Sequence, residues 1–337
     1  PVPDRVARAL GRARARAVLG ARAGGGAVSG ELLLTVFVAG VAAGTTLLFA
    51  SVGEIVAERA GVLNLGVEGM MLVGAVTGFV VNEQVRSPWL GALAGILAGG
   101  ALGLLHATLV VSFATNQVVT GLALVIFASG LSSYVGEDVV GVAPPETFER
   151  IAIPGLSSIP VLGRILFDQN ALVYLSFVLV PLTWWFLFRT RPGLNLRSVG
   201  ESPETADAVG LSVTRTRYVA VVVGGAFAGL GGAYLSLAQA PSWTPNMTAG
   251  RGWIAIALVI FATWSPIRAA LGAYLFGCVE ALAFRLQTVG IEIPSFFVNM
   301  MPYLFTIVVL VVISRETIGR RLAAPGALGN AYVREER

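Results

Sequence analysis

Lysine is absent from this chain of 337 residues, because every one of its 23 basic residues is an arginine. A P-loop needs a lysine against the phosphates of its nucleotide, and a Schiff-base enzyme needs a lysine amine. The chain therefore neither hydrolyses ATP with a P-loop nor forms a lysine imine. If ATP drives its function, another chain must use that ATP.

Cysteine and histidine are almost absent, since the chain has one of each, Cys278 and His106. A single cysteine excludes an intrachain disulfide and a cysteine-based metal site. We find no Ser-His-Asp spacing, no carboxylate dyad and no glycine-rich phosphate loop. The sequence therefore predicts no catalytic residue, no metal and no cofactor bound by this chain, and it gives little support to a membrane-embedded enzyme.

Charge is also scarce. Charged residues make up 12% of the chain and hydrophobic residues 55%, whereas a soluble domain carries about 25% charged residues. This composition predicts a polytopic membrane protein. The formal net charge of +4 comes mainly from the N-terminal tail and from arginines beside the apolar segments, so it reflects topology and implies no nucleic-acid partner.

Long apolar segments fill most of the chain, and a helix needs about 20 such residues to span a bilayer. We expect an all-α transmembrane bundle of about nine segments, near residues 32–53, 61–82, 88–111, 116–135, 170–189, 217–240, 252–265, 267–287 and 294–314. The segment 252–265 is short and ends before Pro266, and 61–82 contains two polar residues and several glycines. Both are expected to be broken or re-entrant.

The arginines suggest how the segments are oriented. We divide the chain into an Arg-rich tail (1–30), a transmembrane domain (31–314) and a C-terminal tail (315–337). Arginines at both ends of the polar loop 189–217, and Arg315, Arg320 and Arg321 in the C-terminal tail, place these regions in the cytoplasm. Five segments before that loop would put the N-terminus outside, so either 61–82 does not cross or the tail lies outside.

Two smaller patterns concern packing and the tail. Glycines at every fourth position of 88–111 predict a span that packs closely against a neighbour; they are Gly91, Gly95, Gly99 and Gly103. The tail 1–30 fits either a basic surface helix or a disordered segment.

The loop 189–217 contains a helix signal. Ser202 suits an N-cap, Pro203 suits the first helical position, Glu204 and Asp207 favour the positive end of the helix dipole, and Gly210 can end the helix in a left-handed conformation. Two turns of helix are marginal alone in water. We therefore expect this helix to dock against something, and we interpret it as a contact for a cytoplasmic partner; a solvated loop is the alternative.

Polar residues inside apolar segments are candidates for a translocation path. The candidates are Asn64, Glu68, Asn116, Gln117 and Glu280. Asn64 and Glu68, four residues apart, would share a helix face, and they could line a cavity or brace a broken helix. Asn116 and Gln117 could face substrate or cap a helix. Glu280 is expected to meet another helix.

The remaining polar and aromatic residues fall near the segment ends. We expect Glu58 and Arg59 to belong to a polar turn. Trp243, Asn246 and Trp253 lie at the connection after 217–240. They could stack on and hydrogen-bond an external substrate, or they could anchor the chain at the membrane interface.

Several long motifs resemble one family in the same order. They are GEIVAERAGVLNLGVEGMMLVGA (53–75), TNQVVTGLAL (115–124), RSVGESPETADAVGLSVTRTRY (197–218), GGAFAGLGGAYLSL (224–237) and GRGWIAIALVIFATWSPIRAALGAYLFG (250–277). The family is the membrane-permease subunits of bacterial ABC importers for branched-chain amino acids and simple sugars, and the resemblance is strongest to its nucleoside-uptake branch. It covers roughly residues 32–314.

The resemblance implies a multi-pass permease of the bacterial inner membrane that imports nucleosides. Its expected partners are a second permease subunit, forming a heterodimer, a cytoplasmic ATPase that binds ATP and Mg, and an external substrate-binding lipoprotein. The loop 189–217 then resembles a coupling loop. The alternatives are a sugar or branched-chain amino acid permease and, from another class, an ion-coupled secondary transporter that uses Glu68 and Glu280.

Overall fold

The computed structural model describes residues 4–288 and 324–333 and positions 297, 300, 304, 307 and 308. The apolar segment 294–314 and the C-terminal arginines from 315 to 321 lie outside the described residues, apart from these isolated positions. The α-helices are α1 (Asp4–Arg59), α2 (Val67–Val85), α3 (Pro88–Ala107), α4 (Gln117–Val135), α5 (Leu162–Leu166), α6 (Ala171–Arg189), α7 (Arg191–Glu201), α8 (Pro203–Ala208), α9 (Val213–Tyr234), α10 (Arg251–Phe261) and α11 (Pro266–Thr288).

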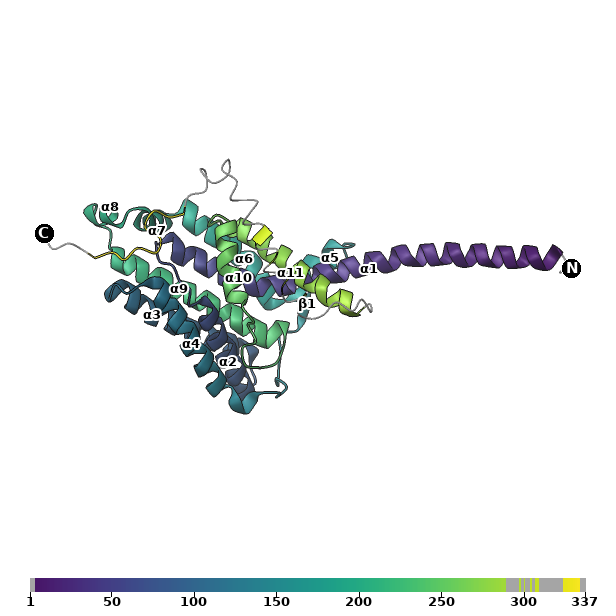
Figure 1. Cartoon of the computed structure of the whole chain (residues 1–337), viewed down its shortest axis with the longest axis horizontal. Helices are drawn as coiled ribbons and strands as arrows, with labels where there is room; N and C mark the ends of the chain where they lie inside the picture. Colours follow the sequence, from purple (N-terminus) through teal and green to yellow (C-terminus); the bar gives the residue numbers. More distant parts are fainter. Residues whose placement is uncertain are drawn as a thin grey trace.

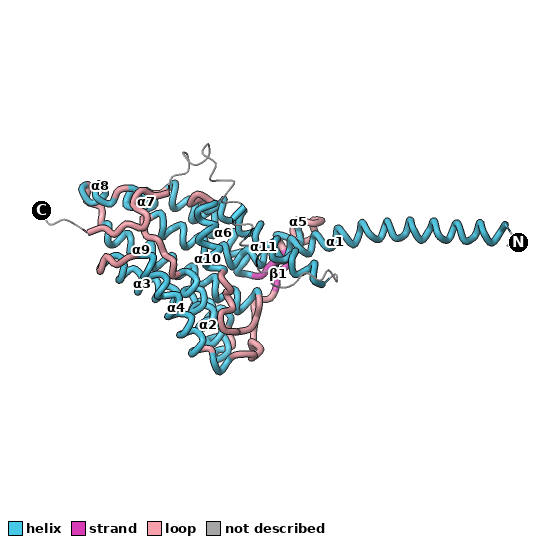
Figure 2. The backbone as a smooth tube through the Cα atoms, viewed as in Figure 1, coloured by secondary structure: helices cyan, strands magenta, loops and turns pink. Residues whose placement is uncertain are grey.

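Shorter elements complete the chain. Two π-helical turns, Thr108–Ser112 and Leu235–Gln239, extend α3 and α9, and a 3-10 turn covers Glu137–Val139. The strands β1 (Arg150–Ala152) and β2 (Asp168–Asn170) pair antiparallel, with Arg150 opposite Asn170. Figure 2 shows how small this hairpin is beside the helices.

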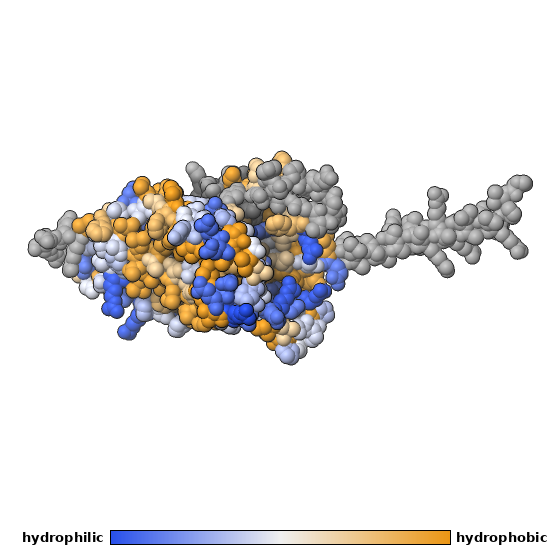
Figure 3. Space-filling view, turned by 90° about the horizontal axis from the view of Figure 1, so that it is seen from below, coloured by the Kyte–Doolittle hydropathy of each residue, from blue (hydrophilic) through white to orange (hydrophobic). Residues whose placement is uncertain are grey.

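The all-α polytopic architecture is confirmed. Within the described residues, six helices are long and apolar enough to cross a membrane by length and composition, namely Gly30–Arg59, Pro88–Ser112, Gln117–Val135, Ala171–Arg189, Val213–Gln239 and Pro266–Arg285. Figure 3 shows one face of the bundle, on which hydrophobic residues cover a broad area between hydrophilic residues toward either end. The helices α2 and α10 are shorter or less apolar, and both pack inside this bundle.

The bundle has two distinct ends (Figure 1). At one end, which we call the α8 end, lie α7, α8 and the C-terminal segment 324–333. At the other, the β1 end, lie the hairpin, α5 and the N-terminal part of α1, which continues beyond the bundle as a single helix. The expected boundary between tail and first span at residue 30 therefore falls inside one continuous helix.

The helix α2 passes through the whole bundle. The turn before it lies at the α8 end, where Leu63 donates to Gln117 Oε1 (2.7 Å), and near its other end Asn82 donates to Glu146 O in the connection that leads to β1 (2.8 Å). The segment 61–82 therefore runs from one end of the bundle to the other. The long helices α1, α2, α3, α4 and α6 precede α7, and the N-terminal end of α1 lies at the end opposite to α7 and α8 (Figure 1).

Two of the passes are only partly helical, as expected for 61–82 and 252–265. Residues 61–66 are turn and irregular backbone before α2 begins at Val67, and residues 240–250 are irregular before α10 begins at Arg251. The two broken passes run in opposite directions. The set α1, α2 and α3 is therefore matched by α9, α10 and α11 in inverted orientation.

Close helix packing in both sets depends on glycine. A Cβ on Gly99 of α3 would lie 2.6 Å from Gly229 Cα of α9, and a Cβ on Gly44 of α1 would lie 2.9 Å from Tyr274 Cα of α11. These separations are too short for any side chain, so only glycine lets the backbones meet. Without a hydrophobic effect between helices in lipid, such contacts are a main source of association, and the predicted close packing of 88–111 is confirmed.

Replacing Gly99 with alanine should therefore destabilise the bundle. We expect Gly99→Ala to cost about 1–3 kcal/mol, as other overpacking substitutions do, and to lower the thermal unfolding midpoint of the detergent-solubilised protein. Gly130→Ala on α4 is the matched control, because its new methyl would meet nothing within 4 Å. Equal midpoints for the two variants would contradict this account.

Candidate functional site

The polar loop 189–217 contains two short helices. α8 begins at Pro203 and ends at Ala208, and Gly210 has a φ of +87°, as the sequence predicted. Ser202 does occupy the N-cap position. Its hydroxyl, however, donates to Thr205 Oγ1 (2.8 Å) and accepts no backbone N–H, so the expected capping bond is not formed.

The other helix, α7, was not predicted. Thr190 is its N-cap and accepts a hydrogen bond from Gly193 N (3.2 Å), while Pro192 stands in its first turn. Both are recognised helix-start signals. The signal was therefore present in the sequence, directly after the apolar segment 170–189.

Contacts within the chain hold α8 in place. Ala206 of α8 is 2% exposed and packs with Val199 of α7, Val213 of α9 and Tyr332 of the C-terminal segment. The opposite face of α8 is open, with Glu204, Thr205, Ala208 and Val209 exposed. Val209 is 73% exposed, so an apolar side chain projects at the tip of an otherwise polar loop.

The helix α7 packs directly on the end of α1. A Cβ on Gly200 would clash with the backbone oxygen of Arg59, so the two backbones touch. Arg59 in turn donates to Trp264 O (3.3 Å) and Thr263 O (3.4 Å) in the turn between α10 and α11. Thr263 and Trp264 both have left-handed backbones, with φ of 50° and 55°, respectively. A chain of contacts therefore runs from the polar loop to α10.

Two buried carboxylates lie beside this turn. Glu54 and Glu58 of α1 are both at most 1% exposed. Glu54 Oε1 accepts from Asn64 N (3.0 Å), and Glu58 Oε2 accepts from Trp264 Nε1. The expectation that Glu58 and Arg59 form a polar turn is wrong, because α1 continues to Arg59, with Glu58 buried and Arg59 half-buried.

Glu68 caps the start of α10. Its carboxylate accepts hydrogen bonds from Thr248 Oγ1 (2.6 Å), Gly250 N (2.9 Å) and Gly252 N (2.6 Å). The first N–H groups of a helix have no partner within the helix, and a negative charge there is favoured by the helix dipole. The two broken passes thus meet at this carboxylate.

Asn64 is not on the same helix face as Glu68, because α2 begins only at Val67. It lies in the irregular turn, where its Oδ1 accepts from Gly66 N (3.1 Å) and its side-chain nitrogen lies 3.4 Å from Met70 Sδ. These contacts correspond to the second alternative for Asn64, in which it braces a broken helix. Neither residue lines the cavity described below.

Asn116 and Gln117 lie at the α8 end. Asn116 caps α4 by accepting from Val119 N (3.1 Å). Gln117 is buried; its Oε1 accepts from Leu63 N (2.7 Å), and its Nε2 donates to Asn330 O (3.4 Å). Arg217 donates to the same Asn330 oxygen (3.1 Å). The C-terminal segment is therefore fastened to the start of α4 and α9.

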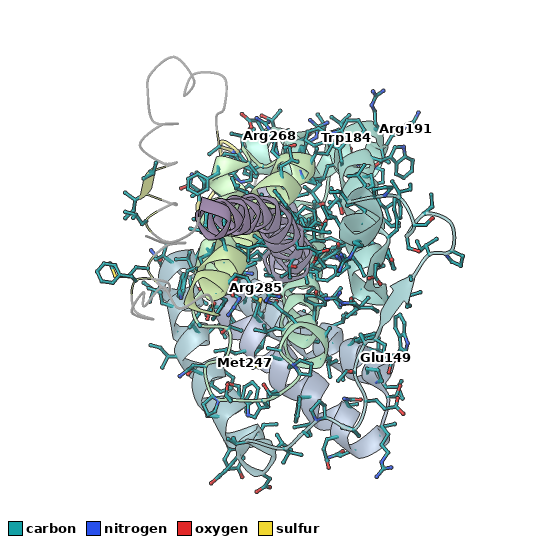
Figure 4. The ribbon with its side chains drawn as sticks, turned by 90° about the vertical axis from the view of Figure 1, so that its right-hand side faces the viewer. Glu149, Trp184, Arg191, Met247, Arg268 and Arg285 are labelled. Carbon is teal, nitrogen blue, oxygen red and sulfur yellow. The ribbon has the colours of Figure 1, made fainter. Side chains whose placement is uncertain are left out.

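A cavity of about 710 Å³ lies at the β1 end, between α1, the hairpin, the end of α9 and the end of α11. Arg251, Glu280 and Gln239 form one polar wall, and Phe148, Met247 and Phe284 form apolar parts. Other polar residues complete the lining, among them Arg150 and Arg285. Figure 4 looks along the bundle toward this end, and the lining residues Met247 and Arg285 lie on the same side of α1 there.

Among the predicted path residues, Glu280 lines this cavity. It forms an ion pair with Arg251, and the two side chains are 18% and 17% exposed. The expectation that Glu280 meets another helix is confirmed, since Arg251 opens α10 while Glu280 lies on α11.

The three predicted external contacts do not line the cavity. Trp243 is fully buried against Ala75, Val76 and Phe79, so it belongs to the packed core. Asn246 accepts from Ser129 Oγ of α4 (2.9 Å), and Trp253 packs against the cluster around Met70. The connection 240–250 descends into the bundle between these elements, which turns Trp243 inward.

Sequence reasoning missed Gln239 as a lining residue. It stands at the end of the segment 217–240, where its Oε1 accepts from Thr46 Oγ1 of α1. A polar residue that directly follows an apolar run is easily interpreted as the membrane boundary. Only the pairing with Thr46, 193 positions away, shows that it points inward.

The family described as "branched-chain amino acid transport system / permease component" matches residues 36–314. The chain belongs to this family of ABC-transporter permeases. It is accordingly a multi-pass protein of the cell membrane.

Three full-length relatives are similar to this permease. "Putative glucose ABC transporter permease protein TsgC13" of Haloferax volcanii is 44% identical, over 88% of this chain and 96% of its own. The guanosine ABC transporter permease NupQ of Bacillus subtilis is 36% identical (86% and 94%), and the nucleoside ABC transporter permease NupC of Lactococcus lactis is 38% identical (87% and 94%).

Glu68→Gln should weaken the permease through α10. An amide offers one acceptor oxygen in place of two, so a buried N–H at Gly250 or Gly252 would lose its partner, at a cost of about 1–3 kcal/mol. We expect a lower thermal unfolding midpoint in detergent. Glu83→Gln, an exposed site on the same helix, is the control, and a midpoint no lower than the control's would refute the capping role.

Proposed function

We propose that this permease forms the translocation path of an ATP-driven importer for nucleosides or simple sugars. The observation that carries the proposal is the cavity at the β1 end, because it has the size of a small-molecule site and combines apolar walls with a few polar groups. The similarity to nucleoside and glucose permeases along nearly their whole length supports both substrate classes. The description of the family adds branched-chain amino acids as a further candidate.

The proposed partners follow from the family and from the absence of lysine. A separate cytoplasmic ATPase binds ATP and Mg and hydrolyses the nucleotide, a second permease subunit completes the path, and an external binding lipoprotein delivers the substrate. The α8 end faces the cytoplasm and the β1 end faces outward. The Arg-rich tail 1–30 then lies on the outer side.

In this proposal the exposed face of α8 contacts the ATPase. Movement there would pass to α7, which touches Arg59, and from Arg59 to the turn at Thr263 and Trp264. That turn ends α10, whose first residue, Arg251, lines the cavity. The helix α10 has 11 residues, so it is a short rigid connection between this turn and the cavity.

Substrate competition tests the proposed transport function. Cells that carry the complete transporter should accumulate a labelled nucleoside or glucose only when this gene is present, and unlabelled nucleosides, sugars and branched-chain amino acids should compete according to class. Uptake should persist when ion gradients are dissipated while ATP is kept high. Loss of uptake under that treatment would favour the ion-coupled secondary transporter using Glu68 and Glu280.

Charge reversal on α8 tests the coupling role of Ser202, Pro203, Glu204, Asp207 and Gly210. Glu204 is exposed on the outer face, so Glu204→Arg removes no buried side chain while placing a repulsive charge at the ATPase contact. We expect uptake to fall by roughly tenfold, the effect of about 1.4 kcal/mol, together with weaker co-purification of the ATPase.

The control is the same substitution at the other end of the molecule. Glu137→Arg changes an exposed glutamate near the β1 end and should leave ATPase co-purification unchanged. Undiminished uptake and ATPase retention in Glu204→Arg would argue against a coupling role for α8.

A further inference from the structure

The polar wall of the cavity has hydrogen-bonding capacity that the protein leaves unused. Glu280 Oε1 is engaged by Arg251 Nη2, but Glu280 Oε2 has no partner among the described residues. Gln239 likewise uses its Oε1 for Thr46, and its side-chain nitrogen has no partner within the same part of the chain. The wall therefore offers one acceptor on a carboxylate and one amide donor.

The protein fixes both groups in position. Arg251 donates to Thr248 O (3.2 Å) at the start of α10 and to Glu280 on α11, so the carboxylate is held between two helices. Gln239 is tied to Thr46 of α1. A group held in this way loses little side-chain entropy when it binds a ligand.

Hydroxyl groups match this wall better than charged groups do. A carboxylate only accepts hydrogen bonds, the amide nitrogen only donates them, and a hydroxyl can do both. Two neighbouring hydroxyls can therefore give a proton to Glu280 and accept one from Gln239. Arg150 and Arg285 line other parts of the cavity, but an anionic group placed at this wall would face the Glu280 carboxylate and could give it no proton, and an aliphatic side chain would leave both polar groups unpaired, which is costly.

We propose that Glu280, held by Arg251, and Gln239 recognise a pair of vicinal hydroxyls on the transported molecule. This inference rests on the proposed transport function and adds to it the chemical feature that the permease reads. Ribonucleosides carry such a pair at the 2′ and 3′ positions, and glucose carries several, so one site can serve both classes. The apolar residues Phe148, Met247 and Phe284 remain for the rest of the substrate.

The test compares substrates that differ by one hydroxyl. Maximal uptake rates are measured at saturating concentration for a ribonucleoside and its 2′-deoxy and 3′-deoxy counterparts, or for glucose and 3-deoxyglucose if the wild type imports sugars. We expect the wild type to favour the intact diol, and we expect Glu280→Gln to reduce that preference roughly tenfold to hundredfold, as for a lost hydrogen bond to a charged group.

Comparing wild type and variant with the same binding lipoprotein removes the lipoprotein's own selectivity from the result. Glu137→Gln, an exposed acid outside the cavity, is the matched control and should leave the preference unchanged. If Glu280→Gln does not insert, Glu280→Asp takes its place. It keeps the charge but shortens the side chain, and it should also lower the preference.

The outcomes separate this inference from the function on which it rests. If uptake of diol and deoxy substrates falls equally in the Glu280 variants, the ion pair is only structural and the inference is wrong, while the transport function stands. If the wild type shows no preference for the diol substrate, the inference is likewise wrong and the transport function stands. If the wild type imports neither nucleosides nor sugars, the proposed function fails and the inference fails with it.

Discussion

The capping of α10 by Glu68 is the interaction on which the arrangement of this permease depends. A helix that begins inside an apolar bundle exposes backbone N–H groups where no water is available to pair with them. The carboxylate of Glu68 supplies acceptors for two of these groups and for the Thr248 hydroxyl. Because Glu68 stands in the first turn of α2, one side chain joins the two broken passes.

The junction at Glu68 lies between two sets of helices in inverted orientation, α1 to α3 and α9 to α11. The glycine contacts between α3 and α9 and between α1 and α11 fix two closely packed helix pairs, and the broken passes lie between them. Broken helices at the interface of inverted repeats are a recurrent way to build a path in membrane transporters, because irregular backbone is tolerated where it lines a cavity or is buried in protein. The cavity beside Arg251 and Glu280 lies at the start of one of these broken passes.

Much of this architecture could be predicted from local sequence signals. The apolar segments, the helix α8 with Pro203 and Gly210, the breaks in 61–82 and 252–265, and the pairing of Glu280 with another helix all follow from composition, spacing and the high cost of charge in lipid. These features depend on short stretches of chain, so local physical rules were sufficient to predict them.

The errors concern residues whose environment is set by distant parts of the chain. Trp243 looked like an interfacial residue, but it is buried because the connection 240–250 enters the bundle beside α2. Glu58 was expected in a polar turn. In the structure it accepts a hydrogen bond from the indole N–H of Trp264, which the left-handed backbone at Trp264 places beside it. Gln239 was missed because its partner Thr46 lies on the first helix. No local pattern contains such pairings.

The C-terminal segment 324–333 also affects how the molecule can be handled. Ala327 donates to Gly200 O, Asn330 accepts from Gln117 and Arg217, and Tyr332 packs under α8. A reporter or affinity tag fused just beyond this segment would therefore emerge beside the exposed face of α8. An attachment at the far end of α1 would leave that face clear, because that end projects from the opposite side of the bundle (Figure 1).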